Sequence, residues 1–135
     1  MIPTNADCII YNRFGNKFIR YDIKDVFWDE EKGSNTIQMG TAIANSLTVF
    51  MDKKDNYIPA MEWIELTEEP VSKFTLQKGD MLIKATSEIT DAPSEFPSDV
   101  SISKHFGVDY AHKILSIDEK IWPSRITSHF EIAGQ

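Results

Sequence analysis

Short β-rich segments recur along the whole chain, and polar turns separate them at close spacing. The cleanest alternation lies near the end of the chain. One face carries Ile126, Ser128, Phe130 and Ile132, and the other carries Arg125, Thr127, His129 and Glu131. Because the side chains of a strand point to opposite faces in turn, this period of two predicts a half-buried strand over residues 125–132.

The first half of the chain is expected to hold three or four strands. Residues 7–12 form the first, Gly15-Asn16 supplies a turn pair that tolerates positive φ, and residues 17–28 continue as one or two strands. Residues 46–51 return to a β-rich composition. The charged and polar stretch between them, residues 29–44, is predicted to be a long exposed loop, a feature that is usually functional or disordered in compact domains.

The second half of the chain adds further strands. Residues 73–76 and 80–85 are expected as strands on either side of the charged turn Gln77-Lys78-Gly79-Asp80, joined as a hairpin or a tight corner. Residues 91–99 hold two prolines and two serines and read as a loop. Residues 111–117 form another strand.

Two short helices are also predicted. Residues 60–66 follow a proline that is tolerated at a first helical turn, and their pattern suits about two turns. Residues 100–106 suit a second helix, capped by Ser98 or Asp99 and ended by Gly107.

These segments predict a mainly β protein. We expect residues 1–135 to form a single domain, an antiparallel β-barrel or sandwich with one or two short helices and a long loop. The length suits one domain, since typical domains run from roughly 100 to 200 residues. No strand–helix–strand unit repeats along the chain, which disfavours a doubly wound α/β fold.

The charge balance is acidic. Fourteen Lys and Arg residues against 21 Asp and Glu residues give a formal charge of −7, which disfavours tight binding to nucleic acid. The chain has no apolar run of about 18 residues for a membrane span, and its start lacks the basic region of a secretory signal. The single cysteine, Cys8, follows the pattern of a buried side chain in a strand and suits a reducing compartment.

No residues stand out as catalytic, cofactor-binding or metal-ligating. His105, His112 and His129 lack the short spacings of a zinc site, and no phosphate-binding glycine loop or nucleophile elbow is present. Acidic groups such as Asp29-Glu30-Glu31 are more often solvated surface charge than a general acid and base. We therefore expect a protein that is not an enzyme and uses no cofactor.

The tryptophans and the predicted loop supply the candidate interface. Trp28, Trp63 and Trp122 each border a loop or the end of an element, and at least two of them are expected to fill the core. Trp63, beside exposed acids on a short helix, is the one that we expect to meet a partner. The candidate interface residues are Asp29, Glu30, Glu31, Ile37, Met39 and Trp63.

Several stretches occur in an order that is similar to a known family. They are IIYNRF, DVFW, SLTVFM followed by DNYIPAMEW, FTLQKGDMLIKA and SHFEIAGQ. The chain thereby resembles small proteins from the structural gene clusters of tailed phages and prophages of Firmicutes, the minor capsid or head–tail connector proteins. Ala85 stands where such relatives tend to place glycine, and DAPSEFPSDVSISKHF has no counterpart that we can match.

The resemblance implies a structural virion protein of the neck, a head-closure (stopper) or minor capsid subunit between the portal or adaptor and the tail. Such proteins are typically small β-barrels that form a ring, with a long loop reaching towards the channel. Expected partners are further copies of the chain, the portal or adaptor and tail proteins. DNA would pass through the lumen without tight binding, and assembly would take place in the host cytoplasm.

Two other functions stay open. A tail-terminator or minor tail protein would share the β-rich profile. A small β-barrel that binds a sugar or cofactor on its aromatic residues belongs to a different class.

Overall fold

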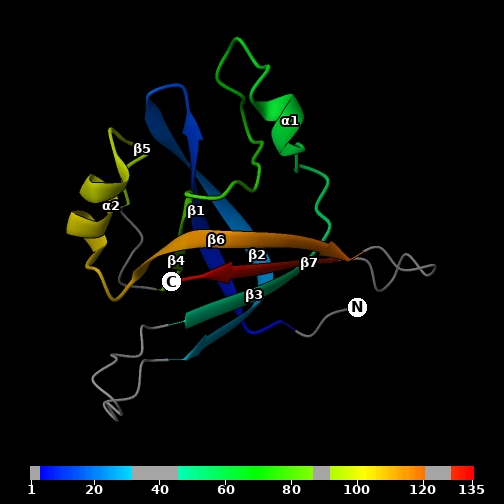
Figure 1. Ribbon diagram of the computed structural model, residues 1–135, viewed down its shortest axis with the longest axis vertical. Helices are drawn as coiled ribbons and strands as arrows, with labels where there is room; N and C mark the ends of the chain where they lie inside the picture. The colour runs from blue at the N-terminus through cyan, green and yellow to red at the C-terminus, as the bar shows by residue number, and fades with distance from the viewer. Residues whose placement is uncertain (1–3, 32–45, 87–91, 121–128) are drawn as a thin grey trace.

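The computed structural model describes residues 4–31, 46–86, 92–120 and 129–135, which form seven strands and two helices. In chain order (Figure 1) they are β1 (Ala6–Phe14), β2 (Lys17–Glu31), β3 (Ser46–Asp52), α1 (Ala60–Trp63), β4 (Met81–Lys84), β5 (Glu95–Phe96), α2 (Asp99–Phe106), β6 (Ala111–Lys120) and β7 (His129–Gly134).

Six of the described strands close into an antiparallel barrel. Their order is β1-β4-β6-β7-β3-β2, and β2 pairs back with β1 to complete the circle. The two-residue strand β5 adds to β2 outside this circle through Phe18↔Phe96 and Ile19↔Glu95. The prediction of a mainly β, antiparallel fold is confirmed, and of the two predicted architectures the barrel is the correct one. The prediction that residues 91–99 form only a loop is wrong, because β5 lies within them.

One long strand, β2, pairs with two different neighbours in the barrel, β1 and β3. It leaves the hairpin turn at Gly15, whose φ is +64°, and pairs first with β1 and then with β3. A bulge opposite Asp7 separates the two stretches. There Asp25 adopts a φ of +59°, and its N–H donates to Asp7 Oδ1 at 3.0 Å. Such a bulge bends a strand and increases its twist, which lets β2 turn from one neighbour to the other.

Past this bend, β2 continues to Glu31, beyond the predicted start of the loop at residue 29. Asp29 pairs with Thr48 and Glu31 pairs with Ser46. The predicted loop over residues 29–44 is therefore wrong at its start, since these acidic residues are part of the barrel wall. The rest of that predicted loop, residues 32–44, lies outside the described residues.

The segment before β4 is a corner and not a hairpin. Of the predicted strand at residues 73–76, only Phe74 forms a bridge, in parallel with Tyr57. The turn itself is present: Asp80 N–H donates to the Gln77 carbonyl at 3.2 Å, and Gly79 adopts a φ of +93°. The predicted strand is wrong because the backbone of Phe74 bonds to Asn56 and Ile58, and that of Thr75 bonds to the Asn12 side chain.

The two helices differ in how well the sequence predicts them. α1 is a single turn that ends at Trp63, shorter than the predicted residues 60–66. α2 follows the prediction: Ser98 Oγ accepts from the Ser101 N–H at 3.1 Å, the Ser101 hydroxyl accepts from the Ser98 N–H, and Gly107 ends the helix at a φ of +97°. None of the helices in the described residues is long and apolar enough to cross a membrane.

Two apolar clusters form the core. The larger fills the barrel and includes Ile10, Trp28, Val49, Leu82 and Phe130. The smaller lies on the outer side of β1 and β4, where α2 and β5 cover it. It consists of Ile9, Tyr11, Phe18, Met81, Ile83, Phe96, Ile102 and Ala111. Because β1 contributes to both clusters, it is buried on both faces, which explains its unbroken apolar run.

The predicted burial of Cys8 and the predicted alternation of β7 are both confirmed. Cys8 lies in the barrel interior, where desolvation raises the pKa of its thiol to about 12. In β7, Phe130 and Ile132 point inward as predicted. On the opposite face, the His129 side chain is only 16 % exposed, and its Nε2 lies 3.4 Å from Glu131 Oε2.

Candidate functional site

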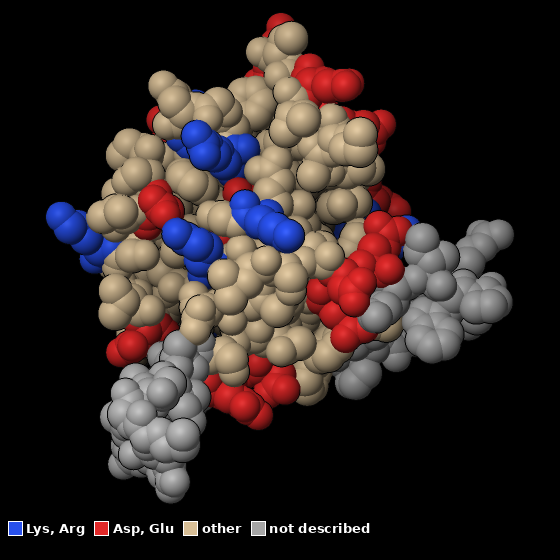
Figure 2. Space-filling model, in the orientation of Figure 1, with Lys and Arg blue, Asp and Glu red and all other residues tan. Residues whose placement is uncertain are grey.

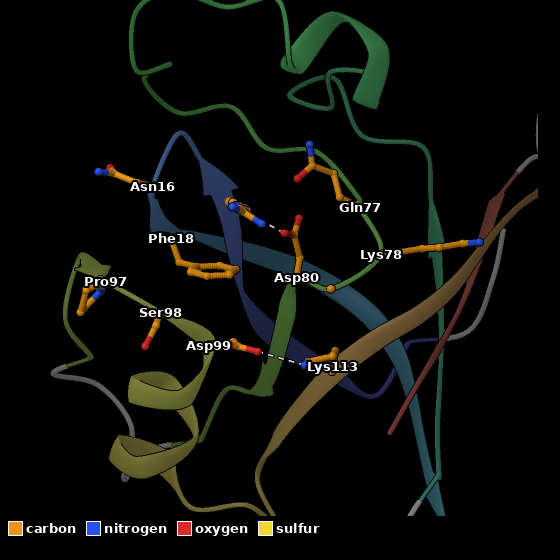
Figure 3. A pocket seen from close by; sticks show the side chains of 11 residues that line it. Asn16, Phe18, Gln77, Lys78, Asp80, Pro97, Ser98, Asp99 and Lys113 are labelled. Atoms are coloured by element: carbon orange, nitrogen blue, oxygen red, sulfur yellow. Dashed lines mark hydrogen bonds and ion pairs between the residues drawn. The ribbon is translucent and has the colours of Figure 1, made fainter.

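A groove on the outside of the barrel gathers side chains from four separate parts of the chain (Figure 3). We call it the basic groove, and its volume is about 320 Å³. The β1–β2 hairpin, the corner before β4, the start of α2 and strand β6 line it. The lining residues are Arg13, Asn16, Phe18, Gln77, Lys78, Gly79, Asp80, Pro97, Ser98, Asp99 and Lys113.

Cations dominate the accessible rim of the groove. Arg13, Lys78 and Lys113 are all exposed, and Lys113 Nζ lies 2.9 Å from Asp99 Oδ2. The other carboxylate, Asp80, is buried. In Figure 2, Lys and Arg side chains gather over the middle and left of this face, whereas Asp and Glu side chains lie mainly along its top, right and lower edges.

A buried polar network lies beneath the groove. The Asn12 amide donates to the Thr75 carbonyl at 2.7 Å and to Asp80 Oδ2 at 2.8 Å, and its oxygen accepts from the Thr75 N–H at 3.0 Å. Asp80 Oδ1 accepts from the Arg13 N–H at 3.0 Å. One asparagine thus makes, towards Thr75, the bonds that a neighbouring strand would make. The backbone of Thr75 is therefore fully paired although this buried residue belongs to no strand.

Burial sets the protonation of this network. Desolvation raises the pKa of Asp80 from 3.8 to about 7, against the opposing effect of the hydrogen bonds from Asn12 and Arg13. The carboxyl group therefore changes charge close to neutral pH. Since both of its oxygens already have partners within the protein, we read it as a structural group.

A second surface lies beside the groove at α1 and the residues after it. We call residues 60–71 the α1 segment. Its glutamates, Glu62, Glu65, Glu68 and Glu69, are all exposed, and residues 60–71 contain no Lys or Arg. Three large apolar side chains are exposed with them: Met61 at 80 %, Ile64 at 73 % and Val71 at 84 %. Exposed apolar side chains grouped in this way mark contact surfaces more often than isolated ones do.

Trp63 holds the α1 segment in place and does not itself face outward. Only 2 % of the residue is exposed, its Nε1–H donates to the Arg13 carbonyl at 2.9 Å, and its ring meets that of Phe14 edge-on at 6.0 Å. The expectation that Trp63 meets a partner is therefore corrected: the ring is a core anchor, and its neighbours Met61 and Ile64 are the exposed residues. The expected core role of two tryptophans is met by Trp28 and Trp63, while Trp122 lies outside the described residues.

The hairpin and the α1 segment together line a pocket of about 420 Å³. Arg13 and Gln77 line both this pocket and the basic groove, so the two surfaces are neighbours. Its remaining lining residues are Phe14, Gly15, Trp63, Ile64, Leu66 and Thr67.

The predicted interface residues do not come together. Asp29, Glu30 and Glu31 lie at the lower end of β2, whereas α1 lies at the opposite end of the barrel (Figure 1). Asp29 and Glu31 are exposed, but Glu30 accepts from Trp28 Nε1–H at 3.0 Å and lies 3.5 Å from His112 Nε2. Ile37 and Met39 lie outside the described residues.

Each of the three histidines packs against an aromatic ring. His112 is buried against the Trp28 ring, and His105 packs against Phe96 and Phe106. Within residues 4–31, 46–86, 92–120 and 129–135, no group of three or more His, Cys, Asp or Glu side chains is arranged to hold a metal ion.

Sequence reasoning missed the groove and the network beneath it. One signal was present: Asn12 is a polar residue directly after the apolar run Cys8–Tyr11, and a polar residue in such a place calls for a buried partner. Nothing local to the sequence links it to Asp80.

Comparison with curated proteins and with solved structures found no significant match. The profile of one family does match, over residues 3–135. Since this covers nearly the whole chain, the protein belongs to DUF6751, a family of unknown function.

Proposed function

We propose that this chain is a structural virion protein of a tailed phage, a head-closure (stopper) or minor capsid subunit of the neck between portal or adaptor and tail. Its resemblance to connector proteins in IIYNRF, DVFW and FTLQKGDMLIKA motivates the proposal. The observation that carries it is the contrast between the inside and the outside of the barrel. Apolar side chains fill the inside, and the features available for contact lie on the outer surface.

A filled barrel suits a building block. Residues that are nearly inaccessible, such as Ile10, Val49 and Phe130, fill the space where a ligand-binding barrel would hold its ligand. Such a wall keeps its shape while its outer face contacts neighbours.

The charge of the chain fits a position around DNA. With a formal charge of −7, a ring of such subunits would present little of the basic surface through which proteins bind the phosphate backbone. DNA would then pass through the lumen without being held. The partners in this proposal are other copies of the chain, the portal or adaptor and the tail proteins.

Deleting the gene from the bacterial strain that encodes the chain tests the proposal. After induction, we expect full-length free tails and heads that fail to retain DNA, and an epitope tag on the chain should label the neck of complemented particles in electron micrographs. Infectious particles of normal yield without the chain would contradict the proposal.

The same experiment separates the neck from the tail. A tail terminator limits polymerisation, so its loss would produce tails of irregular length, and label would lie at the tail end of the junction. Tails of uniform length support the head-closure or minor capsid role.

The alternative of a small-ligand barrel has one observation in its favour. The groove and the adjacent pocket, at about 320 and 420 Å³, reach the size at which small ligands are bound. A ligand there would lie outside the barrel. A thermal-shift screen in which one small molecule raises the melting temperature by several degrees would favour this function.

A further inference from the structure

Two surfaces of the molecule carry opposite charge and exposed apolar groups. The α1 segment presents four exposed glutamates, of which Glu69 is paired with Lys17 of β2 at 3.1 Å. Arg13, Lys78, Lys113 and Phe18 line the basic groove; the Lys113 side chain points to Asp99, and the Lys78 side chain extends away from Phe18 (Figure 3). Of the two carboxylates in the groove, Asp99 is paired with Lys113 and Asp80 is buried.

Their apolar parts match as well. Met61 and Ile64 project from the α1 segment at 80 % and 73 % exposure. Beside the groove, Val100 follows Asp99 at the start of α2 and is 62 % exposed, and Pro97 lies on the rim. A contact between the two surfaces would remove these side chains from water and bring glutamates towards lysines, and such complementarity both attracts and orients partners.

The α1 segment is already held in a fixed position. Trp63 is hydrogen-bonded to the Arg13 carbonyl, and Ile58 N–H donates to the Phe74 carbonyl at 2.8 Å just before the helix. Little conformational freedom is then lost when the segment binds, because its anchor is formed in the single chain. With its anchor buried, the outward side chains Met61 and Ile64 remain exposed in one copy.

We propose that the α1 segment of one copy docks against the basic groove of a second copy. This inference rests on the proposed function, in which copies of the chain assemble, and it names the surfaces that meet. When two copies form this contact once and not reciprocally, it is heterologous, so each copy still offers one free surface. Repetition of the contact then forms a ring or a filament.

Cysteine cross-linking tests which surfaces meet. Ile64→Cys and Val100→Cys each place one accessible thiol on one surface, since the native Cys8 is fully buried. One variant is labelled with heavy nitrogen, the two are mixed over a range of concentrations, and a short bismaleimide is added. Mass spectrometry then separates mixed dimers from the two kinds of identical dimer.

We expect mixed dimers to exceed the identical dimers well beyond the random ratio. Asp55→Cys, on an exposed turn outside the α1 segment that lines neither the basic groove nor the adjacent pocket, serves as the matched control and should give only random cross-links with either variant. Random ratios for the Ile64→Cys and Val100→Cys mixture, or no dimers at any concentration, would overturn the proposal.

Charge reversal shows whether the charges guide the contact. Adding Glu62→Lys and Glu65→Lys to the Ile64→Cys protein should reduce the yield of mixed dimers roughly tenfold. Adding Arg13→Glu and Lys78→Glu to the Val100→Cys protein should have the same effect. Mixing the two charge-reversed proteins should restore them. All four residues are exposed, and melting curves verify that the variants fold. Failure of restoration would overturn the charge-guided contact.

The docking inference and the proposed function can fail separately. If the epitope-tagged chain labels the neck but mixed dimers are absent, only the docking inference fails. If mixed dimers form but the chain is absent from purified particles, the neck assignment fails and the self-association stands.

Discussion

The barrel interior and the polar network under the groove are both buried, but different forces hold them. In the interior, side chains such as Val49 and Phe130 are stabilised by exclusion from water and by close packing. In the network, Asn12, Thr75 and Asp80 depend on hydrogen bonds of fixed direction. We therefore expect side-chain volume to decide which substitutions the interior tolerates. In the network, hydrogen-bond pairing and protonation should decide it.

The largest effect is expected in the interior. Phe130→Ala removes a ring that is 1 % exposed and packs against Tyr57, so the cavity and the lost burial should lower the free energy of unfolding by about 3–5 kcal/mol. Urea denaturation followed by circular dichroism measures this change. Met61→Ala, at a side chain on the surface, is the control and should change stability by less than about 0.5 kcal/mol. Equal effects of the two substitutions would show that the interior is not packed as described.

The next effect is expected in the network. Asp80→Ala leaves the Asn12 amide and the Arg13 N–H without their shared acceptor, and each unpaired buried donor costs about 1–3 kcal/mol. We expect a loss of roughly 2–4 kcal/mol in the same denaturation assay. Asp55→Ala removes an exposed carboxylate and should have almost no effect. If the two variants were equally stable, directional pairing would not be what holds residues 74–80.

The network should also respond to pH, unlike the apolar interior. The pKa of Asp80 is raised to about 7 in the folded protein, so between pH 4 and 7 the folded state binds more protons than the unfolded state. Stability is then highest at the acidic end of this window and falls as the pH rises, by roughly 2 kcal/mol between pH 5 and 7.

Asp80→Asn isolates this contribution. Asparagine does not titrate, so the variant should be less stable by a nearly constant amount and should lack the part of the slope that Asp80 causes. The two proteins differ only at residue 80, and the difference between the two pH profiles therefore reports Asp80. Parallel profiles would show that Asp80 is ionised throughout.

The smallest effect concerns a hydroxyl within the network. Thr75 Oγ1 is buried and has no hydrogen-bond partner in the described part of the chain. Thr75→Val keeps the shape and the backbone bonds to Asn12, and it should stabilise the protein by up to about 1 kcal/mol. Thr75→Ser keeps the hydroxyl and loses a methyl group, so it should destabilise by about 1 kcal/mol. A destabilising Thr75→Val would point to a bound water as partner.

The sequence predicts those parts of the fold that depend on neighbouring residues. The turn at Gly15-Asn16, the β-rich strand at residues 46–51 and the Ser98 cap of α2 are all local patterns, and all are confirmed. The strand predicted at residues 73–76 is wrong because a short apolar run has the same pattern whether its backbone bonds to a strand or to a side chain.

The candidate site could not be predicted for a related reason. Arg13, Lys78 and Lys113 come from distant parts of the chain, and only the closure of the barrel brings them together. Trp63 was misjudged because a single helical turn has no periodicity that tells which side is inward. The docking of its ring on the β1–β2 hairpin reverses the expected orientation.

Strand β2 has a mechanical consequence. It is unbroken over 15 residues, at most roughly 50 Å, and it joins the hairpin tip beside the groove to the far rim at Glu31. A pull on Glu31 would load the ladder with β3 first, and then, past the kink at Asp25, the ladder with β1. Tension applied at one rim would thus reach the other along a single backbone, without any intervening loop to absorb it.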